Sequence, residues 1–325
     1  MKAPRSVAGR SSRFPMPVLL AGLLVVALFH GPGSAAPAKS RQETFPSPEA
    51  AAQALVDALG KNDRGRLSAI FGPGSDAVIS SGDDVADRAA RSRFIKEYAD
   101  RNTLEKAGED KVILQVGNDD WPFPIPIVRN GSAWRFDTAA GKEEILNRRI
   151  GANELRVIEL LDAYVAAQRE YASRDRRGDG VYAYAQRIAS TPETKDGLYW
   201  KAREGEEPSP LGPLAAEAGR EGYARKGGSR NAAPFHGYYF RILKGQGKHA
   251  PGGSYSYIVR GNMILGFAMV AYPARYGSSG IMTFLVNQDG VVYQKDLGKN
   301  TAKAADGMRT YDPDSSWKRA DAAAK

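Results

Sequence analysis

The chain has 325 residues, and its 46 Lys and Arg residues outnumber its 37 Asp and Glu residues, which gives a formal net charge of +9. No dense run of Lys and Arg occurs, so a nucleic-acid groove is not indicated, and mild attraction to anionic surfaces is the stronger expectation. There is no cysteine, which excludes disulfides, thiolate metal sites and a cysteine nucleophile.

The first 38 residues have the three parts of a secretory signal peptide. Basic residues come first, and an apolar run over residues 16–29 follows. Small residues come next, with cleavage favoured after Ala36 or Ala38. The apolar run has about 14 residues, whereas a membrane-spanning helix needs roughly 20. Cleavage is therefore favoured over retention as an anchor. The sequence predicts export by the general secretory route to the periplasm or the medium, with no stable transmembrane segment after cleavage.

Residues 39–151 are predicted to form an N-terminal lobe. Ser47-Pro48-Glu49 is a strong helix start, and helices are predicted over 48–59, 64–71 and 84–100. A strand over 111–116 and a hairpin around Asn130-Gly131 follow, with arms over 125–129 and 133–136. Helices followed by a strand and a hairpin indicate a cone-like α+β lobe, similar to the nuclear-transport-factor-two or polyketide-cyclase type.

Residues 152–311 are predicted to form a long helix and a sheet lobe. A short helix over 142–149 should end at Gly151, and Asn153 should cap a long connecting helix through about residue 173. Residues 190–228 should be mainly loop. A C-terminal antiparallel five-stranded meander is expected from strands over 237–243, 255–260, 265–272, 281–287 and 291–295. Residues 312–325 are predicted to be a disordered tail.

Several long motifs connect the chain with a known family. They are Asp119-Asp-Trp-Pro-Phe-Pro-Ile-Pro126, Trp134-Arg-Phe-Asp-Thr-Ala-Ala-Gly141, Glu144-Ile-Leu-Asn-Arg-Arg-Ile-Gly151, Asp196-Gly-Leu-Tyr-Trp200, His236-Gly-Tyr-Tyr-Phe-Arg-Ile-Leu243 and Val286-Asn-Gln-Asp-Gly-Val-Val-Tyr293. On these motifs the chain resembles the bacterial exported proteins of domain-of-unknown-function family 2950. The resemblance implies export, and it brings no established activity from which catalytic residues could be carried over.

The C-terminal part also resembles a pilin or pseudopilin headgroup. The similar stretches are residues 237–240, 266–273 and 283–290, which lie on predicted strands. Pilins join a long apolar N-terminal helix directly to the headgroup, whereas about 115 residues separate the signal from the long helix here. The resemblance therefore implies a related sheet module and not assembly into a pilus.

Two groups of residues are the candidate binding sites. Asp119 and Asp120 precede Trp121, and in a cone-like lobe they could face the open mouth. The alternative is a turn in which both carboxylates cap backbone amides and Trp121 belongs to the core. The second group lies in the predicted loop and consists of Asp196, Tyr199 and Trp200.

Metal and nucleophile chemistry are weakly indicated. Asp175, Asp179 and Gly180 have the spacing of a calcium loop, but Arg177 replaces the middle ligand. A helix-ending turn held by Asp–Arg pairs is the favoured interpretation, and no cofactor is predicted. No Gly-x-Ser-x-Gly motif occurs, and His249 with Ser254 is the nearest approach to a nucleophile pair.

These observations predict an exported envelope protein of the α+β class. Binding or scaffolding is favoured over catalysis, with another envelope protein or a cell-surface polymer as the partner. The alternative is an envelope hydrolase or isomerase that uses an acidic cleft between the two lobes.

Overall fold

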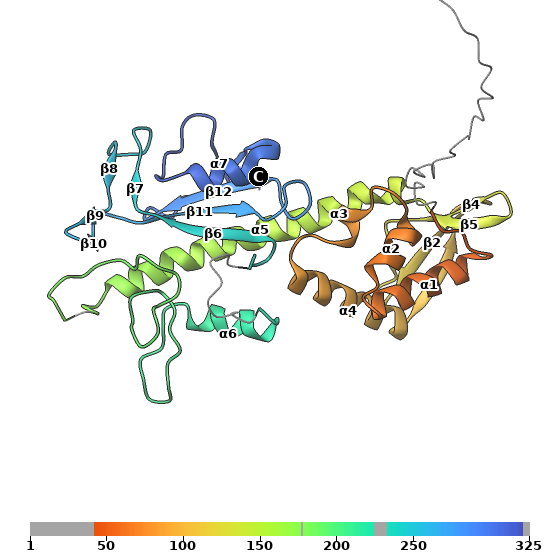
Figure 1. Cartoon of the computed structure of the whole chain (residues 1–325), viewed down its shortest axis with the longest axis horizontal. Helices are drawn as coiled ribbons and strands as arrows, with labels where there is room; N and C mark the ends of the chain where they lie inside the picture. Colours follow the sequence, from red (N-terminus) through yellow and green to blue (C-terminus); the bar gives the residue numbers. More distant parts are fainter. Residues whose placement is uncertain (1–41, 177, 224–232, 321–325) are drawn as a thin grey trace, which may run out of the picture. The chain divides into compact units, whose positions relative to one another are not determined.

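The computed structural model describes residues 42–176, 178–223 and 233–320 (Figure 1). It confirms the α+β class, because helices combine with antiparallel sheets and one long helix. The predicted signal peptide lies outside the described residues. Among the helices of the described part, none is both long and apolar enough to cross a membrane.

The N-terminal lobe begins with four helices. They are α1 (Pro48–Gly60), α2 (Arg64–Phe71), α3 (Asp76–Ile79) and α4 (Asp84–Asp100). The Ser47 hydroxyl accepts a hydrogen bond from the Ala50 amide at 3.2 Å, so the predicted cap of α1 is confirmed. The short helix α3 was not predicted, because it has only four residues and follows the loop-like stretch Gly72-Pro73-Gly74.

An antiparallel sheet completes this lobe. Its strands are β1 (Asn102–Lys106), β2 (Lys111–Val116), β3 (Trp121–Pro122), β4 (Ile127–Asn130) and β5 (Ala133–Phe136), in the order β1-β2-β4-β5 with β3 also paired to β2. Asn130 pairs with Ala133, which confirms the predicted hairpin. One core cluster contains buried side chains of α1, α2 and this sheet, among them Leu55, Ile70, Leu114, Ile127 and Phe136.

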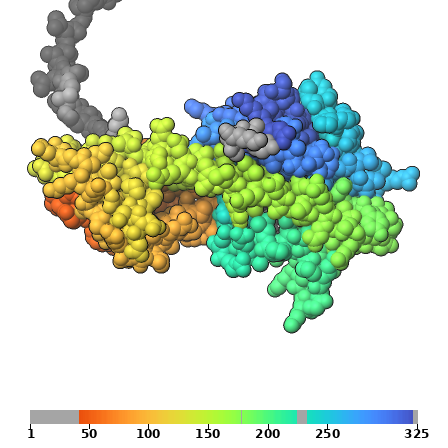
Figure 2. Space-filling view, turned by 180° about the vertical axis from the view of Figure 1, so that it is seen from behind, coloured from red at the N-terminus to blue at the C-terminus, as the bar shows by residue number. Residues whose placement is uncertain are grey.

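A single 35-residue helix, α5 (Thr138–Ala172), follows the sheet. The prediction of two helices separated at Gly151 was wrong. A glycine inside a helix costs only about 1 kcal/mol relative to alanine, and α5 contacts both cores, with Ile145 in the first and Val157 in the second. The predicted boundary between residues 151 and 152 therefore falls inside a helix. On the face seen in Figure 2, the yellow-green side chains of α5 form an uncovered band.

The C-terminal lobe contains a five-stranded antiparallel sheet, as predicted, but one strand differs. Its strands are β6 (Tyr238–Leu243), β11 (Ala268–Pro273), β12 (Met282–Asn287), β13 (Tyr293–Asp296) and β14 (Lys318–Arg319), in the order β14-β13-β12-β11-β6. Residues 312–320 are thus not a disordered tail, since β14 pairs with β13 and the Ala320 amide donates to the Val292 carbonyl at 2.9 Å.

Residues 255–260 were predicted to be the missing strand and instead form two short ribbons. Strand β8 (Tyr255–Ser256) pairs with β7 (Gly245–Gln246), and β9 (Ile258–Val259) pairs with β10 (Asn262–Met263). Two further helices, α6 (Gly212–Arg220) and α7 (Thr301–Gly307), and the 3-10 turn η1 (Gly298–Asn300) complete the described elements. Helix α5 packs on β12, and the second core cluster surrounds this contact, with Leu161, Tyr164, Phe267, Val270 and Phe284 among its buried members.

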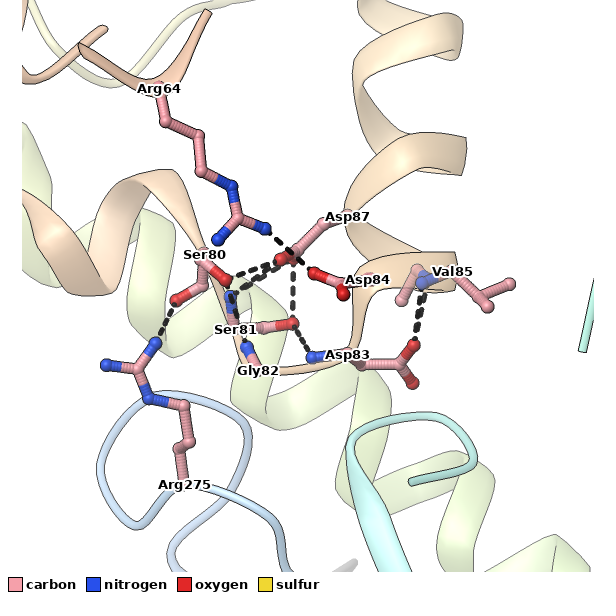
Figure 3. Close-up of polar contacts among 10 residues, drawn as sticks. Arg64, Ser80, Ser81, Gly82, Asp83, Asp84, Val85, Asp87 and Arg275 are labelled. Atoms are coloured by element: carbon pink, nitrogen blue, oxygen red, sulfur yellow. Dashed lines mark hydrogen bonds and ion pairs between the residues drawn. The ribbon is translucent and has the colours of Figure 1, made fainter. Parts of the chain in front are cut away.

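Polar contacts join the turn between α3 and α4 to the C-terminal lobe (Figure 3). The buried carboxylate of Asp87 accepts hydrogen bonds from the Ser81 hydroxyl at 2.7 Å and the Ser80 hydroxyl at 2.9 Å. The Ser80 carbonyl in turn accepts from the guanidinium of Arg275 at 3.1 Å. The serine hydroxyls satisfy a carboxylate that would otherwise be buried without partners, whereas the bond from Arg275 lies at the surface.

Candidate functional site

The first predicted group lies at the edge of the N-terminal sheet. Asp119 is exposed in the turn before β3, and Asp120 forms an ion pair with Arg101 at 3.3 Å. Trp121 is 36% exposed, and the Arg148 guanidinium lies 5.5 Å from its ring centre. Trp121 is therefore a surface residue and not part of the core, whereas Trp134 is buried.

The second predicted group lies in the C-terminal lobe. Asp196 accepts hydrogen bonds from the Thr191 amide at 2.7 Å and from the hydroxyls of Thr191 and Thr194, both at 2.8 Å. Burial raises the pKa of the Asp196 carboxyl, but these hydrogen bonds and the nearby charge of Arg187 outweigh it and hold the pKa below its ordinary value. Asp196 is thus an ionised acceptor and a poor proton donor near neutral pH.

The other two members of this group have mainly packing contacts. Trp200 is buried and donates through its indole nitrogen to the Glu207 carbonyl at 3.1 Å. Tyr199 is half-buried, and its amide donates to the Ile188 carbonyl at 2.9 Å. In the described part of the chain no hydrogen bond, ion pair or ring contact joins this group to Asp119, Asp120 or Trp121.

Asp196 lines a cavity of about 250 Å³, which we call the Arg176 cavity. The residues that line it are Tyr171, Arg176, Val181, Ala183, Tyr184, Gln186, Arg187, Asp196, Lys244 and Asn262. Three of them are cations and one is a carboxylate. No residue of the Asp119–Trp121 group belongs to this lining.

Arg176 follows the end of α5 and is held rigidly. Its side chain is only 4% exposed, and its guanidinium pairs with Glu207 at 2.7 Å. The same guanidinium lies 5.0 Å from the ring centre of Tyr171 and 5.2 Å from that of Trp200. Because both aromatic faces and the carboxylate act on one planar group, the orientation of Arg176 is fixed before any ligand arrives.

Glu207 is shared by more than one cation. Besides Arg176, it pairs with Arg174 at 2.8 Å and with Lys195 at 3.7 Å. Burial raises the pKa of the Glu207 carboxyl, but the hydrogen bond and charge of Arg176, with the charges of Arg174 and Lys195, bring it below the ordinary value. One carboxylate thus pairs with three cations, and of these Arg176 lines the cavity.

The calcium-like segment forms a turn at the same end of α5. The Asp175 carboxylate accepts hydrogen bonds from the amides of Gly178 at 2.9 Å, Asp179 at 3.3 Å and Gly180 at 2.7 Å. These bonds hold the turn through the Asp175 side chain. Within residues 42–176, 178–223 and 233–320, no group of three His, Asp or Glu side chains is arranged to hold a metal ion.

His249 forms a pair with Asp312 at the surface. Its Nδ1 lies 3.1 Å from the Asp312 carboxylate, and its amide donates to the same carboxylate at 2.8 Å. A His–Asp pair of this kind acts in a hydrolytic triad only when a serine lies within hydrogen-bond reach of the other imidazole nitrogen. Among the described residues, no hydrogen bond joins His249 to Ser254, the partner considered from the sequence, and the hydrogen bonds of His249 go to Asp312.

Sequence reasoning missed Arg176 and Lys244 as site residues. Arg176 lies beside the calcium-like segment and was not named as a site residue, and Lys244 is one isolated cation directly after a strand. The sequence does place Arg176 shortly after a long helix and before the loop that contains Trp200. That order along the chain does not predict that the two side chains are in contact.

A family model described as "Protein of unknown function (DUF2950)" matches residues 42–320. No curated protein and no solved structure matches the chain. The resemblance to a pilin headgroup therefore stays a prediction.

Proposed function

We propose that this chain, which belongs to the DUF2950 family, is an exported envelope protein that binds an anionic partner non-catalytically through the Arg176 cavity. The observation that carries the proposal is the charge of the lining, which has three cations, Arg176, Arg187 and Lys244, and a single carboxylate, Asp196. Asp196 pairs with Arg187 at 3.6 Å. Export is supported by the signal pattern of the first 38 residues, which lies outside the described structure.

The chemistry of the cavity favours binding over acid–base catalysis. A general acid or base works best when its pKa lies near the operating pH, whereas hydrogen bonds hold the pKa of Asp196 low. Arginine stays protonated at neutral pH and so cannot act as a general base, but its rigid donors match carboxylate and phosphate groups. The guanidinium of Arg176 is already oriented by Glu207, so little side-chain entropy is lost when an anion binds.

The partner would be a cell-surface polymer or an envelope protein that carries carboxylate or phosphate groups. An experiment with residues 39–325 can separate binding from turnover. Purified protein is mixed with insoluble envelope polymer, and the bound fraction and any released soluble product are measured together. We expect saturable binding without release, and Arg187→Gln should weaken the binding at least about tenfold, since it removes a charge from the cavity.

Arg203→Gln is the matched control, because Arg203 is exposed and does not line the cavity. Equal binding by Arg187→Gln and Arg203→Gln would contradict the proposal. Release of soluble product that disappears in His249→Gln or Asp120→Asn would instead favour the alternative, a hydrolase.

A further inference from the structure

A second cavity lies next to the Arg176 cavity and shares one residue with it. We call it the Arg241 cavity. It encloses about 560 Å³ and is lined by Arg241, Ile242, Lys244, Gly245, Gln246, Ser254, Tyr255, Ser256, Arg309 and Thr310. Lys244 lines both cavities, so the two are neighbours on one surface of the C-terminal lobe.

The lining of the Arg241 cavity carries three positive charges and no carboxylate. Arg241 donates to the Met308 carbonyl at 2.7 Å and to the Ala305 carbonyl, at the end of α7. Arg309 donates to the Asp306 carbonyl at 2.7 Å. Within the described residues, neither of these arginines nor Lys244 forms an ion pair with a carboxylate. Their side chains are anchored by neutral acceptors, and their charges are left for an anionic ligand.

The remaining lining suits a sugar ring. Tyr255 and Ile242 supply apolar surface, and Ser254 and Thr310 supply hydroxyl groups. Both Tyr255 and Ile242 are half-buried, so part of each side chain is open to a ligand. Ligand sites commonly combine such apolar faces with a few polar groups that fix orientation. Together with the three cations, this composition fits a carbohydrate that carries acidic groups.

Lys244 is held between the two cavities by contacts on both sides. Its ammonium donates to the amide oxygen of Gln186, a residue of the Arg176 cavity, at 3.1 Å. Its carbonyl accepts from the Tyr257 amide at 2.9 Å, directly after β8 of the Arg241 cavity. A ligand long enough to leave one cavity would therefore pass Lys244 before it entered the other.

We infer that the Arg176 and Arg241 cavities are adjacent subsites for one chain of an acidic polysaccharide, with Lys244 at their junction. The inference rests on the proposed binding function and narrows its partner to a repeating, carboxylate-bearing sugar polymer. Occupation of two linked subsites makes the second binding event intramolecular, so affinity should rise steeply with chain length.

The test uses residues 39–325 and size-defined oligogalacturonates as the probe, measured by calorimetry at two salt concentrations. We expect the oligomers to bind at least about tenfold tighter than the monomer and to lose affinity in high salt. Lys244→Gln should weaken the monomer as well, because Lys244 lines both cavities. It should weaken the long oligomers more, by at least about tenfold, because only they extend past the junction. Lys299→Gln, a substitution in η1 outside both cavities, is the control, and circular dichroism confirms that each variant is folded.

The outcomes separate this inference from the proposed function. One outcome would overturn this inference and leave the proposed function intact. In it, the monomer and the oligomers bind with equal affinity, Arg187→Gln weakens the binding of both, and Arg309→Gln weakens neither. The Arg176 cavity would then be the single working subsite. If neither the monomer nor the oligomers bind, the inference of an acidic polysaccharide is also overturned. The proposed function is then tested separately by the binding of envelope polymer described above. Tighter binding of single-stranded DNA of equal charge, or equal binding of neutral dextran, would also overturn the assignment to an acidic polysaccharide.

Discussion

The backbone amide of Gly237 donates a hydrogen bond of 2.9 Å to the buried carboxylate of Asp83, across 154 positions of the sequence. The other oxygen of the same carboxylate caps α4, where it accepts from the amides of Val85 and Ala86, both at 3.0 Å. The hydroxyl of Tyr223 adds a bond of 2.8 Å. One side chain thus holds both the start of α4 and the turn that precedes β6.

Replacing Asp83 should therefore cost more than replacing an ordinary helix cap. We expect Asp83→Ala to lower the free energy of unfolding by about 2–4 kcal/mol, because it removes a cap and leaves the Gly237 amide and the Tyr223 hydroxyl without their acceptor. Asp63→Ala is the matched control, since Asp63 caps α2 through the Arg66 amide at an exposed site, and it should cost about 1 kcal/mol. Equal losses in urea denaturation would show that the long-range bonds contribute nothing.

Two glycines of α5 should respond in opposite directions to alanine. A Cβ at Gly141 would lie 2.3 Å from the Pro124 carbonyl oxygen, so Gly141→Ala must displace backbone and should cost about 2 kcal/mol or more. A Cβ at Gly151 meets nothing within 4 Å, and Gly151→Ala should raise the free energy of unfolding by about 0.5–1 kcal/mol through better helix propensity. Thermal unfolding of both variants tests the pair, and destabilisation by Gly151→Ala would contradict a continuous helix.

Removing the carboxylate beside Arg176 should destabilise the C-terminal lobe. Glu207→Gln leaves a guanidinium that is 4% exposed without its counter-charge, and we expect a loss of about 1–3 kcal/mol because Glu207 itself is partly solvated. Glu159→Gln breaks an exposed pair with Arg156 in the same helix and should cost about 0.5 kcal/mol or less. Guanidinium denaturation that gives similar values for both would contradict the buried setting of Arg176.

His236 should make stability depend on pH. Burial lowers the pKa of the His236 imidazole, and the positive charge of Arg156 acts in the same direction, while the negative charges of Glu221, Asp83 and Glu217 oppose the shift without reversing it. Its Nε2 lies 3.1 Å from the Glu221 carboxylate, but the geometry does not align a hydrogen bond. The folded state therefore binds a proton less readily than the unfolded state.

This difference stabilises the fold above about pH 6.5, the ordinary pKa of histidine, and the stabilisation is lost as the pH falls below that value. We expect His236→Asn to flatten the decline in the free energy of unfolding between pH 7 and about pH 5. His249→Asn, which removes the exposed imidazole paired with Asp312, is the comparison. An unchanged slope in His236→Asn would show that this imidazole does not contribute.

Local signals in the sequence located most elements, because caps and turns depend on residues close in the chain. The cap at Ser47 and the hairpin at Asn130 are confirmed for this reason. Pairing between distant segments could not be predicted: β14 is two residues long and becomes a strand only through its contact with β13. Gly151 was overinterpreted as a helix end, since packing on two cores outweighs its weak intrinsic preference.

The candidate site was predicted only in part for the same reason. Asp196 lies in a cavity, but its cationic neighbours come from the end of α5, from residues after it and from the end of β6. No periodic pattern links these segments. The pairing of Asp196 with the Asp119–Trp121 group into one acidic cleft stays a prediction.

Because α5 is one continuous helix, its length determines how the side chains of its second half are oriented relative to those of its first half. Each residue added to a helix turns everything beyond it by about 100° and advances it by about 1.5 Å. An insertion near Gly151 would rotate Val157 and the buried side chains that follow it away from the sheet, while Ile145 kept its own neighbours. Related chains should therefore conserve the number of residues between these two positions even where the residues themselves vary, and hybrids assembled from two homologues should fold only when that spacing is preserved.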